Sequence, residues 1–256
     1  MIRNPVPAAV CCAVLFVALA ATSARAQSVT EASTPLGGSA DQAAVSHRDS
    51  PSTWKGAFVD SFRLLMLEHS GRIAFQAKTR RELGGPFFPD YARSVKWPHT
   101  WSDGDGWFVN YVGHPLHGAA AGRTWLNNDP ASRTLDLSLS KKYWASRAKA
   151  ARWTALYSLQ FEFGPLSEAS IGNVGMNPIS RGWVDHVITP AGAFALMVGE
   201  DALDRSFLKW AESRTANKLV RATLRTAGTP GRALSNIANG RAPWFRDGRP
   251  LNWDGK

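Results

Sequence analysis

Hydrophobic positions along the chain recur at helical rather than strand spacing. Trp54, Phe58, Phe62, Leu65 and His69 follow one another at intervals of three or four residues. Such intervals place side chains on one face of a helix. We therefore predict that ordered structure starts near Trp54 with an amphipathic helix.

Three later segments, residues 108–126, 143–170 and 183–205, are rich in apolar and small residues. Charge or proline interrupts each of them, and a membrane-spanning helix needs about 20 apolar residues. We expect buried helices whose backbones approach closely at glycines. These glycines are Gly118, Gly122, Gly192 and Gly199. No segment alternates apolar and polar residues over a length typical of a strand. The predicted fold is therefore mainly α, a compact bundle of short Gly/Ala-rich helices with irregular aromatic loops.

The stretches between and after these segments predict connections. Residues 84–100 are dense in proline and aromatic side chains and residues 127–140 are mostly polar, so we expect loops at both places. One further helix is predicted after Asp204, ending at the Gly-Thr-Pro-Gly sequence of residues 228–231. Residues 232–256 contain little that forms a regular element.

The N-terminal residues have the pattern of a cleavable secretory signal peptide. Arg3 supplies a positive charge, residues 8–21 are apolar, and Ala24-Arg25-Ala26 offers the small-x-small sequence that signal peptidase recognises. An uncleaved anchor is the alternative. Cleavage after Ala26 would remove both cysteines, which excludes disulfides and thiolate metal sites from the mature chain.

These patterns divide the chain into four predicted parts. A signal peptide (1–26) precedes a disordered linker (27–52), which lacks the aromatic residues that a core needs. A helical domain (53–227) and a basic aromatic C-terminal extension (228–256) follow. We expect an exported protein of the periplasm or cell envelope, peripheral to a membrane.

Positive charge is concentrated near the C-terminus. Residues 205–256 hold eleven Lys or Arg and three acidic residues, whereas residues 27–204 are neutral. Basic and aromatic side chains interleave there, which suits an anionic membrane surface. The alternative is an extension that folds back over the bundle, and no motif points to nucleic acid. The predicted membrane-surface residues are Arg241, Trp244, Phe245, Arg246, Arg249 and Trp253.

Polar residues inside the apolar segments are the candidates for chemistry, because their burial requires partners. They are Asn110, His114, His117, Glu162, Glu168, Asp185, Thr189 and Glu200. Pro115 favours a helix start with His114 at or near the N-cap. Our leading interpretation is a structural polar network that fixes helix register. The alternatives are an acid–base site using His114 with Glu162 and Asp185, and a metal site using His114 with Glu162, Glu168 or Asp185.

The sequences NYVGHPLHGAAAG, FEFGPLSEAS and DHVITPAGAFALMVGEDALDR resemble blocks of a domain-of-unknown-function family of bacterial envelope proteins. Its members carry N-x-x-x-H-P-x-x-G, a Trp/Phe-Glu segment with a second Glu, and Asp-x-Ile-x-Thr-Pro-x-Gly-Gly…Gly-Glu. The resemblance covers residues 54–205 and departs at Ala193, where the family has a second Gly, and at the long connection 127–140. It implies a compact helical envelope protein but no activity. The motif positions of that family would correspond to Asn110, His114, Pro115, Gly118, Glu162, Glu168, Asp185, Thr189, Pro190, Gly192, Gly199 and Glu200.

The function predicted from the sequence is therefore an exported helical envelope protein of no assigned reaction. The alternative is a small envelope hydrolase that acts on a lipid or lipid-linked substrate through His114, Glu162 and Asp185. No cofactor is predicted for the leading interpretation. A divalent metal ion would be needed only if the alternative is a metal-assisted hydrolase.

The mature protein is expected to begin at Gln27, because small residues at Ala24 and Ala26 fit the peptidase. N-terminal sequencing of protein from an envelope fraction measures this directly. Recovery of intact Met1 in a membrane pellet would show an uncleaved anchor instead.

Overall fold

The computed structural model describes residues 54–83, 86–94, 100–171 and 182–251. Helices dominate these ranges, and the β-structure found there is one isolated bridge between Thr100 and Gly182. The predicted mainly α bundle is thus confirmed. Among the described helices, none is long and apolar enough to cross a membrane. The predicted signal peptide and linker lie outside the described residues.

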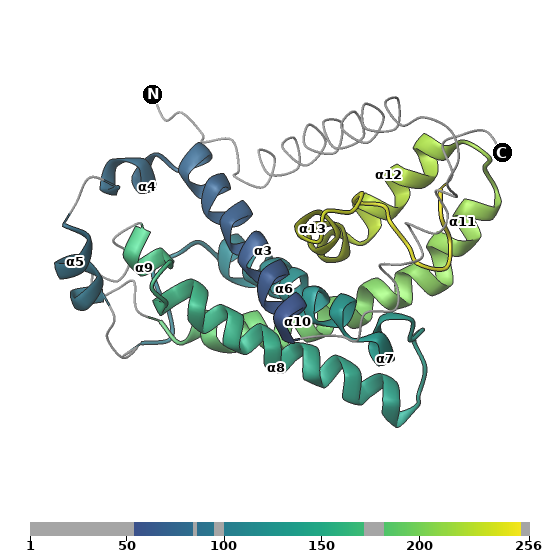
Figure 1. Cartoon of the computed structure of the whole chain (residues 1–256), viewed down its shortest axis with the longest axis horizontal. Coiled ribbons are helices and arrows are strands. Elements are labelled where there is room, and N and C mark those ends of the chain that lie inside the picture. The colour runs from purple at the N-terminus through teal and green to yellow at the C-terminus, as the bar shows by residue number, and fades with distance from the viewer. Residues whose placement is uncertain (1–53, 84–85, 95–99, 172–181, 252–256) are drawn as a thin grey trace, which may run out of the picture.

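Four helices form the centre of the bundle: α3 (Trp54–Phe75), α6 (His114–Asn128), α8 (Lys141–Phe163) and α10 (Val184–Leu203). Two π-helical turns, η1 (Val109–Gly113) and η3 (Asp204–Leu208), adjoin α6 and α10. The shorter helices are α4 (Ala77–Glu82), α5 (Phe87–Ser94), α7 (Pro130–Arg133), α9 (Glu168–Ile171), α11 (Lys209–Ser213), α12 (Lys218–Gly228) and α13 (Pro230–Ala238). Figure 1 shows α4, α5 and α9 at one end of the molecule, α11 and α12 at the other, and α13 between α12 and α3.

α6 is the central helix, packed most extensively against α10 and then against α8, α13 and α3. Its glycines make the close approach that the sequence predicts. A Cβ atom on Gly118 would lie 2.8 Å from side-chain carbons of both Thr154 and Thr189. A Cβ atom on Gly122 would lie 2.7 Å from the Met197 sulfur. The α6–α8–α10 contact therefore depends on the absence of side chains at these two positions.

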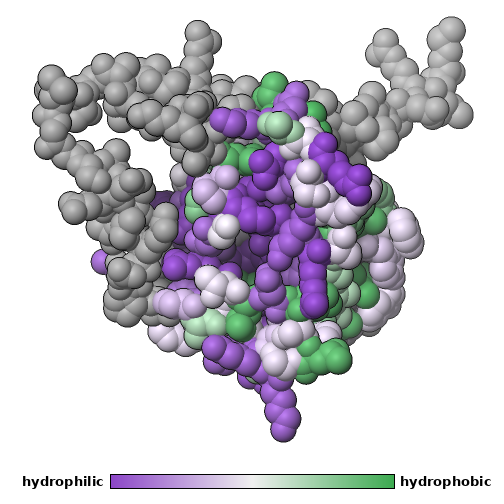
Figure 2. Space-filling model, turned by 90° about the vertical axis from the view of Figure 1, so that its right-hand side faces the viewer, coloured by the Kyte–Doolittle hydropathy of each residue, from purple (hydrophilic) through white to green (hydrophobic). Residues whose placement is uncertain are grey.

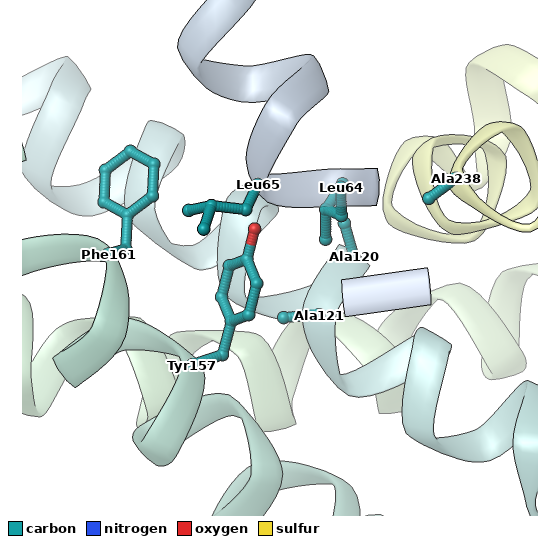
Figure 3. Packing of buried hydrophobic residues seen from close by; sticks show 7 residues of the cluster. All are labelled: Leu64, Leu65, Ala120, Ala121, Tyr157, Phe161 and Ala238. Atoms are coloured by element: carbon teal, nitrogen blue, oxygen red, sulfur yellow. The ribbon is translucent and has the colours of Figure 1, made fainter. Parts of the chain in front are cut away.

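The apolar core lies on both sides of α6 and uses many small residues. Figure 3 shows one cluster, in which α3, α6, α8 and α13 meet through Leu64, Leu65, Ala120, Ala121, Tyr157, Phe161 and Ala238. The second cluster contains Ala119, Leu126, Ala150, Ala193 and Met197. Most of the core residues that α6 contributes are alanines. The neighbouring helices therefore lie close to α6, and few long side chains fill the space between them.

The expectation that residues after 231 lack regular structure is wrong, because α13 occupies Pro230–Ala238. Proline at the first helical positions has a φ angle that suits a helix start. Small residues then allow the helix to dock: a Cβ atom on Gly231 would lie 2.9 Å from the Ala119 Cβ. The predicted C-terminal extension therefore begins with a helix that belongs to the core.

Three other boundaries differ from the sequence prediction. The expected loop 84–100 contains α5, in which the Phe87 and Tyr91 rings stack 6.3 Å apart. The single helix predicted after Asp204 is interrupted, because the Asn217 side chain accepts backbone hydrogen bonds and starts α12. The expected loop 127–140 contains α7. By contrast, α6 starts at His114, next to its N-cap Gly113, as Pro115 predicts, although η1 runs helically into it.

Replacing Gly118 with Ala should lower the free energy of unfolding by about 1–3 kcal/mol, because the new methyl group overpacks the α6–α8–α10 contact. Gly199→Ala is the matched control on α10, where nothing lies within 4 Å of the added Cβ. That change should be neutral or stabilise by up to about 1 kcal/mol through helix propensity. Chemical denaturation of both variants measures the difference, and equal stabilities would refute this packing account.

Candidate metal and acid–base site

The side chains of His114, Glu162 and Asp185 meet at the end of the bundle that carries α9. They come from the first turn of α6, the last turn of α8 and the first turn of α10. One potential ligand atom from each lies within 4.8 Å of the other two. His114 Nε2 is 3.3 Å from Asp185 Oδ1. The structure thus brings together the three residues that the sequence analysis proposed as one acid–base or metal site.

Asp103 adds a further carboxylate to this cluster, and sequence analysis missed it. Its Oδ1 accepts hydrogen bonds from Asn110 Nδ2 at 2.8 Å and from the Asp105 backbone N–H at 3.0 Å. Asp103, Asp105 and His114 form a second group whose ligand atoms lie within 4.8 Å of one another. The alternating acids of the Asp-Gly-Asp-Gly sequence at residues 103–106 were the available signal, but Asp and Gly are also the residues typical of a simple turn.

Several buried polar atoms of the cluster have no hydrogen-bond partner. They are Glu162 Oε1, Asp185 Oδ1, Asn110 Oδ1 and Thr189 Oγ1. His114 Nε2 and Asp185 Oδ1, 3.3 Å apart, do not form a hydrogen bond, whereas the Asp185 side chain shares one with Asp103. Proteins satisfy the large majority of buried polar atoms. A group of orphaned atoms in one place therefore needs an explanation other than helix register.

Burial and like charge hold the carboxyl groups in their protonated forms. Burial, then the charges of Glu168 and Asp185, raise the pKa of Glu162 well above its usual range. Burial and then the neighbouring Asp103 raise the pKa of Asp185 to about 9. These shifts mean that the carboxyl groups of the cluster cannot all be ionised, because they lie close together with too little positive charge nearby.

His114 and Asp103 have the opposite shifts. Burial and then the nearby His117 lower the pKa of His114 to about 4, so its imidazole is neutral at physiological pH. Neutral imidazole is the form that binds metal ions. Burial opposes ionisation of Asp103, but hydrogen bonds from Asn110 and the Asp105 amide outweigh it and lower the pKa.

The predicted residues His117 and Glu168 lie beside the cluster with partners of their own. His117 Nδ1 is 3.0 Å from Glu68 Oε1, and the Tyr157 hydroxyl donates to Glu68 Oε2 at 2.8 Å. Glu168 Oε1 is 2.9 Å from Arg72 Nε. These pairs match our interpretation of a structural network, although His117 Nε2 and Arg72 Nη1 are also buried without partners.

Glu200 does not lie near His114. The sequence analysis placed both residues in one polar network, whereas the structure has two separate clusters. Glu200 lies fifteen residues after Asp185 on α10, about 22 Å along the helix axis. Its Oε1 accepts the Gly231 backbone N–H at 2.6 Å, and its Oε2 is 3.3 Å from Arg123. The adjacent Asp201 pairs with three arginines at 2.6–2.8 Å: Arg123, Arg147 and Arg232. Sequence analysis missed these arginines, because a lone arginine is usually a solvated surface charge.

The described residues among those predicted to meet a membrane, 241–249, fold back onto the bundle. Arg249 makes two hydrogen bonds to Asp204 at 2.6 and 2.7 Å, and the guanidinium of Arg241 lies 5.0 Å from the Phe245 ring centre. Arg246 is buried, and Trp244 and Phe245 are half-buried. These are contacts of the fold-back alternative. Trp253 lies outside the described residues, and the membrane role stays a prediction.

Glu162→Gln should stabilise the metal-free protein at pH 7, by about 1–3 kcal/mol, because it removes a buried acid that lacks partners. The pKa of Glu162 is raised in the folded state, so its destabilising effect grows above the ordinary carboxyl pKa. The gain should therefore vanish near pH 4. Denaturation in EDTA at both pH values measures it. Glu68→Gln, which removes a partner of His117 and Tyr157, should destabilise instead, and destabilisation by both variants would support a structural cluster.

No protein-family model, curated protein or solved structure matches this chain. The resemblance to an envelope family therefore stays a prediction, and the function must be argued from the site.

Proposed function

We propose that this chain is a divalent-metal protein whose ion is held by His114, Glu162 and Asp185, and that the centre supports metal-assisted hydrolysis. The observation that carries the proposal is the buried carboxyl group of Glu162. The residue is only 8% exposed, and its Oε1 has no hydrogen-bond partner although two other ligand residues lie beside it.

The donor set fits a divalent cation. Imidazole nitrogen with carboxylate oxygens is a ligand combination used for Zn²⁺ and other divalent transition metals. A cation among Glu162, Asp185 and Asp103 would compensate the like charges that raise the first two pKa values. It would also give partners to the orphaned oxygens. A purely structural network would instead be expected to satisfy those atoms within the protein.

The chain's own residues supply the remaining parts of a hydrolytic site. Three protein ligands leave coordination positions open, as in catalytic zinc sites. A metal ion held there would polarise a substrate oxygen. Asp103, kept ionised by Asn110, lies beside His114 and is our candidate to accept a proton from an attacking water.

The surface next to Asp103 suits a substrate with an apolar part. Trp101 and Trp107 are 50% and 69% exposed, although large aromatic side chains usually lie inside. The Trp101 indole donates to the Tyr111 hydroxyl at 3.1 Å, and the Trp107 and Tyr111 rings stack 5.8 Å apart. This aromatic surface supports a lipid or lipid-linked ester as the substrate class.

Titration of the EDTA-treated mature protein with Zn²⁺ and with Mn²⁺ tests the centre, followed by elemental analysis after desalting. We expect one ion per chain for the wild type, and loss of binding in His114→Ala and Asp185→Asn. His186→Ala is the matched control, because His186 adjoins Asp185 in sequence but stacks on Phe163. Absence of stoichiometric binding, or binding that survives in both ligand variants, would refute the metal centre.

Hydrolysis of a p-nitrophenyl ester with a medium-length acyl chain tests the second half of the proposal. The metal-loaded wild type should hydrolyse it and the EDTA-treated protein should not. Asp103→Asn should still bind metal but lose activity by about a hundredfold or more, as expected for removal of a general base. If Asp103→Asn remains fully active, the proton acceptor is assigned wrongly even though the metal centre stands.

A further inference from the structure

A second candidate site lies at the other end of α10, where a cavity of 310 Å³ opens between η3, α13, residues 132–137 and residues 245–249. Figure 2 views this end of the molecule and shows hydrophilic residues gathered around a hollow. The cavity is separate from the His114 cluster, because Asp201 at its wall lies about 24 Å along the helix axis from Asp185. Its size is at the lower end of the range for small-molecule pockets.

Positive charge exceeds negative charge in this cavity. Among the described residues that line it, eight are Arg or Lys and four are Asp, a net charge of +4. The internal ion pairs do not remove this excess. Asp201 pairs with Arg123, Arg147 and Arg232, and Asp204 is shared between Arg249 and the more distant Arg246. Glu200 and Glu212, which do not line the cavity, make second ion pairs with Arg123 and Arg249. An anion is the ligand that such a cavity would attract.

Arg246 shows the lack of compensation most clearly. The residue is only 5% exposed, and its Nε has no hydrogen-bond partner, the nearest carboxylate oxygen being 3.7 Å away on Asp204. Burial, and then the nearby Arg232, lower its pKa to about 9. Arg123 and Arg232 also have buried Nε atoms without partners. All three arginines line the cavity, so incompletely compensated guanidinium charge surrounds the space that an anion would occupy.

We infer that this cavity binds a phosphate monoester group. Guanidinium groups recognise phosphate by paired hydrogen bonds, and a dianion would compensate part of the +4 charge. The source is either a small soluble metabolite or the headgroup of a phosphatidic-acid-type lipid, which share this chemistry. The site takes a different ligand class from the metal centre and does not depend on it.

Calorimetric titration of the mature protein with glycerol 3-phosphate tests the inference, at constant ionic strength set with NaCl. We expect saturable one-to-one binding. Arg246→Gln should weaken it at least about tenfold, because it removes charge-assisted hydrogen bonds. Arg63→Gln, remote from the cavity and paired with Asp60, is the matched control and should change nothing.

Two rim residues give a test that does not depend on a buried substitution. Lys209 and Asp136 both line the cavity, lie 3.3 Å apart and are 40% and 79% exposed at the side chain, so neither variant should impair folding. Lys209→Gln should weaken binding about two- to fivefold, and Asp136→Asn should tighten it by a similar factor. Changes of the same sign would contradict an electrostatic anion site.

Co-sedimentation with phosphatidylcholine vesicles distinguishes the two sources. Stronger retention on vesicles with phosphatidic acid than with phosphatidylglycerol, lost in Arg246→Gln, would identify the lipid headgroup. Binding of glycerol 3-phosphate without such retention would identify a soluble ligand. No saturable binding to either probe, or binding that Arg246→Gln and Lys209→Gln leave unchanged, would overturn the inference.

Discussion

The close contact of α6 with α10 is the constraint on which the rest of the structure depends. Gly118 and Gly122 let the two backbones approach, and Gly192 does the same from the α10 side, where a Cβ atom would lie 2.6 Å from Pro115. Both candidate sites are built on this pair. α6 contributes His114 at one end and α10 contributes Asp185, while further along the same helices Arg123 faces Glu200 and Asp201. One packing register therefore positions both clusters.

The two clusters have opposite electrostatic character. Carboxyl groups outnumber cations around His114, and guanidinium groups outnumber carboxylates around Asp201. Each π-helical turn adjoins one of them, η1 before His114 and η3 after Asp201. Such turns occur frequently at functional sites. Buried acids that cannot ionise at one end and excess guanidinium charge at the other both lower the stability of a fold. We therefore favour a cationic ligand at the first and an anionic ligand at the second over structural networks.

Much of the helical architecture could be predicted from the sequence, because it follows from spacing. The periodic hydrophobic residues of α3 and the small residues of α6 are local signals, and each has the expected counterpart. The convergence of His114, Glu162 and Asp185 was also proposed, since polar residues in apolar segments must find one another. The position of α13 could not be predicted, because its core contacts are made by small residues, such as Gly231 against Ala119 of the distant helix α6.

The burial of several arginines and the role of Asp103 could not be predicted from the sequence either, because both depend on tertiary contacts. The burial of Arg225, which is 0% exposed, follows from its pairing with Glu212 and with carbonyl groups of Trp244 and Arg249, all brought together by the tertiary fold. Nothing in the local sequence distinguishes it from an exposed arginine. Asp103 likewise gains its role only when η1 places Asn110 beside it.

The proposed metal centre requires that the unpartnered carboxyl oxygens around His114 be ligands. Anomalous diffraction at the zinc absorption edge, from crystals of the zinc-loaded mature protein, tests that claim directly. We expect one strong anomalous peak bounded by His114, Glu162 and Asp185. A structure whose anomalous peaks all lie elsewhere, with those carboxyl groups satisfied by protein or water, would contradict it.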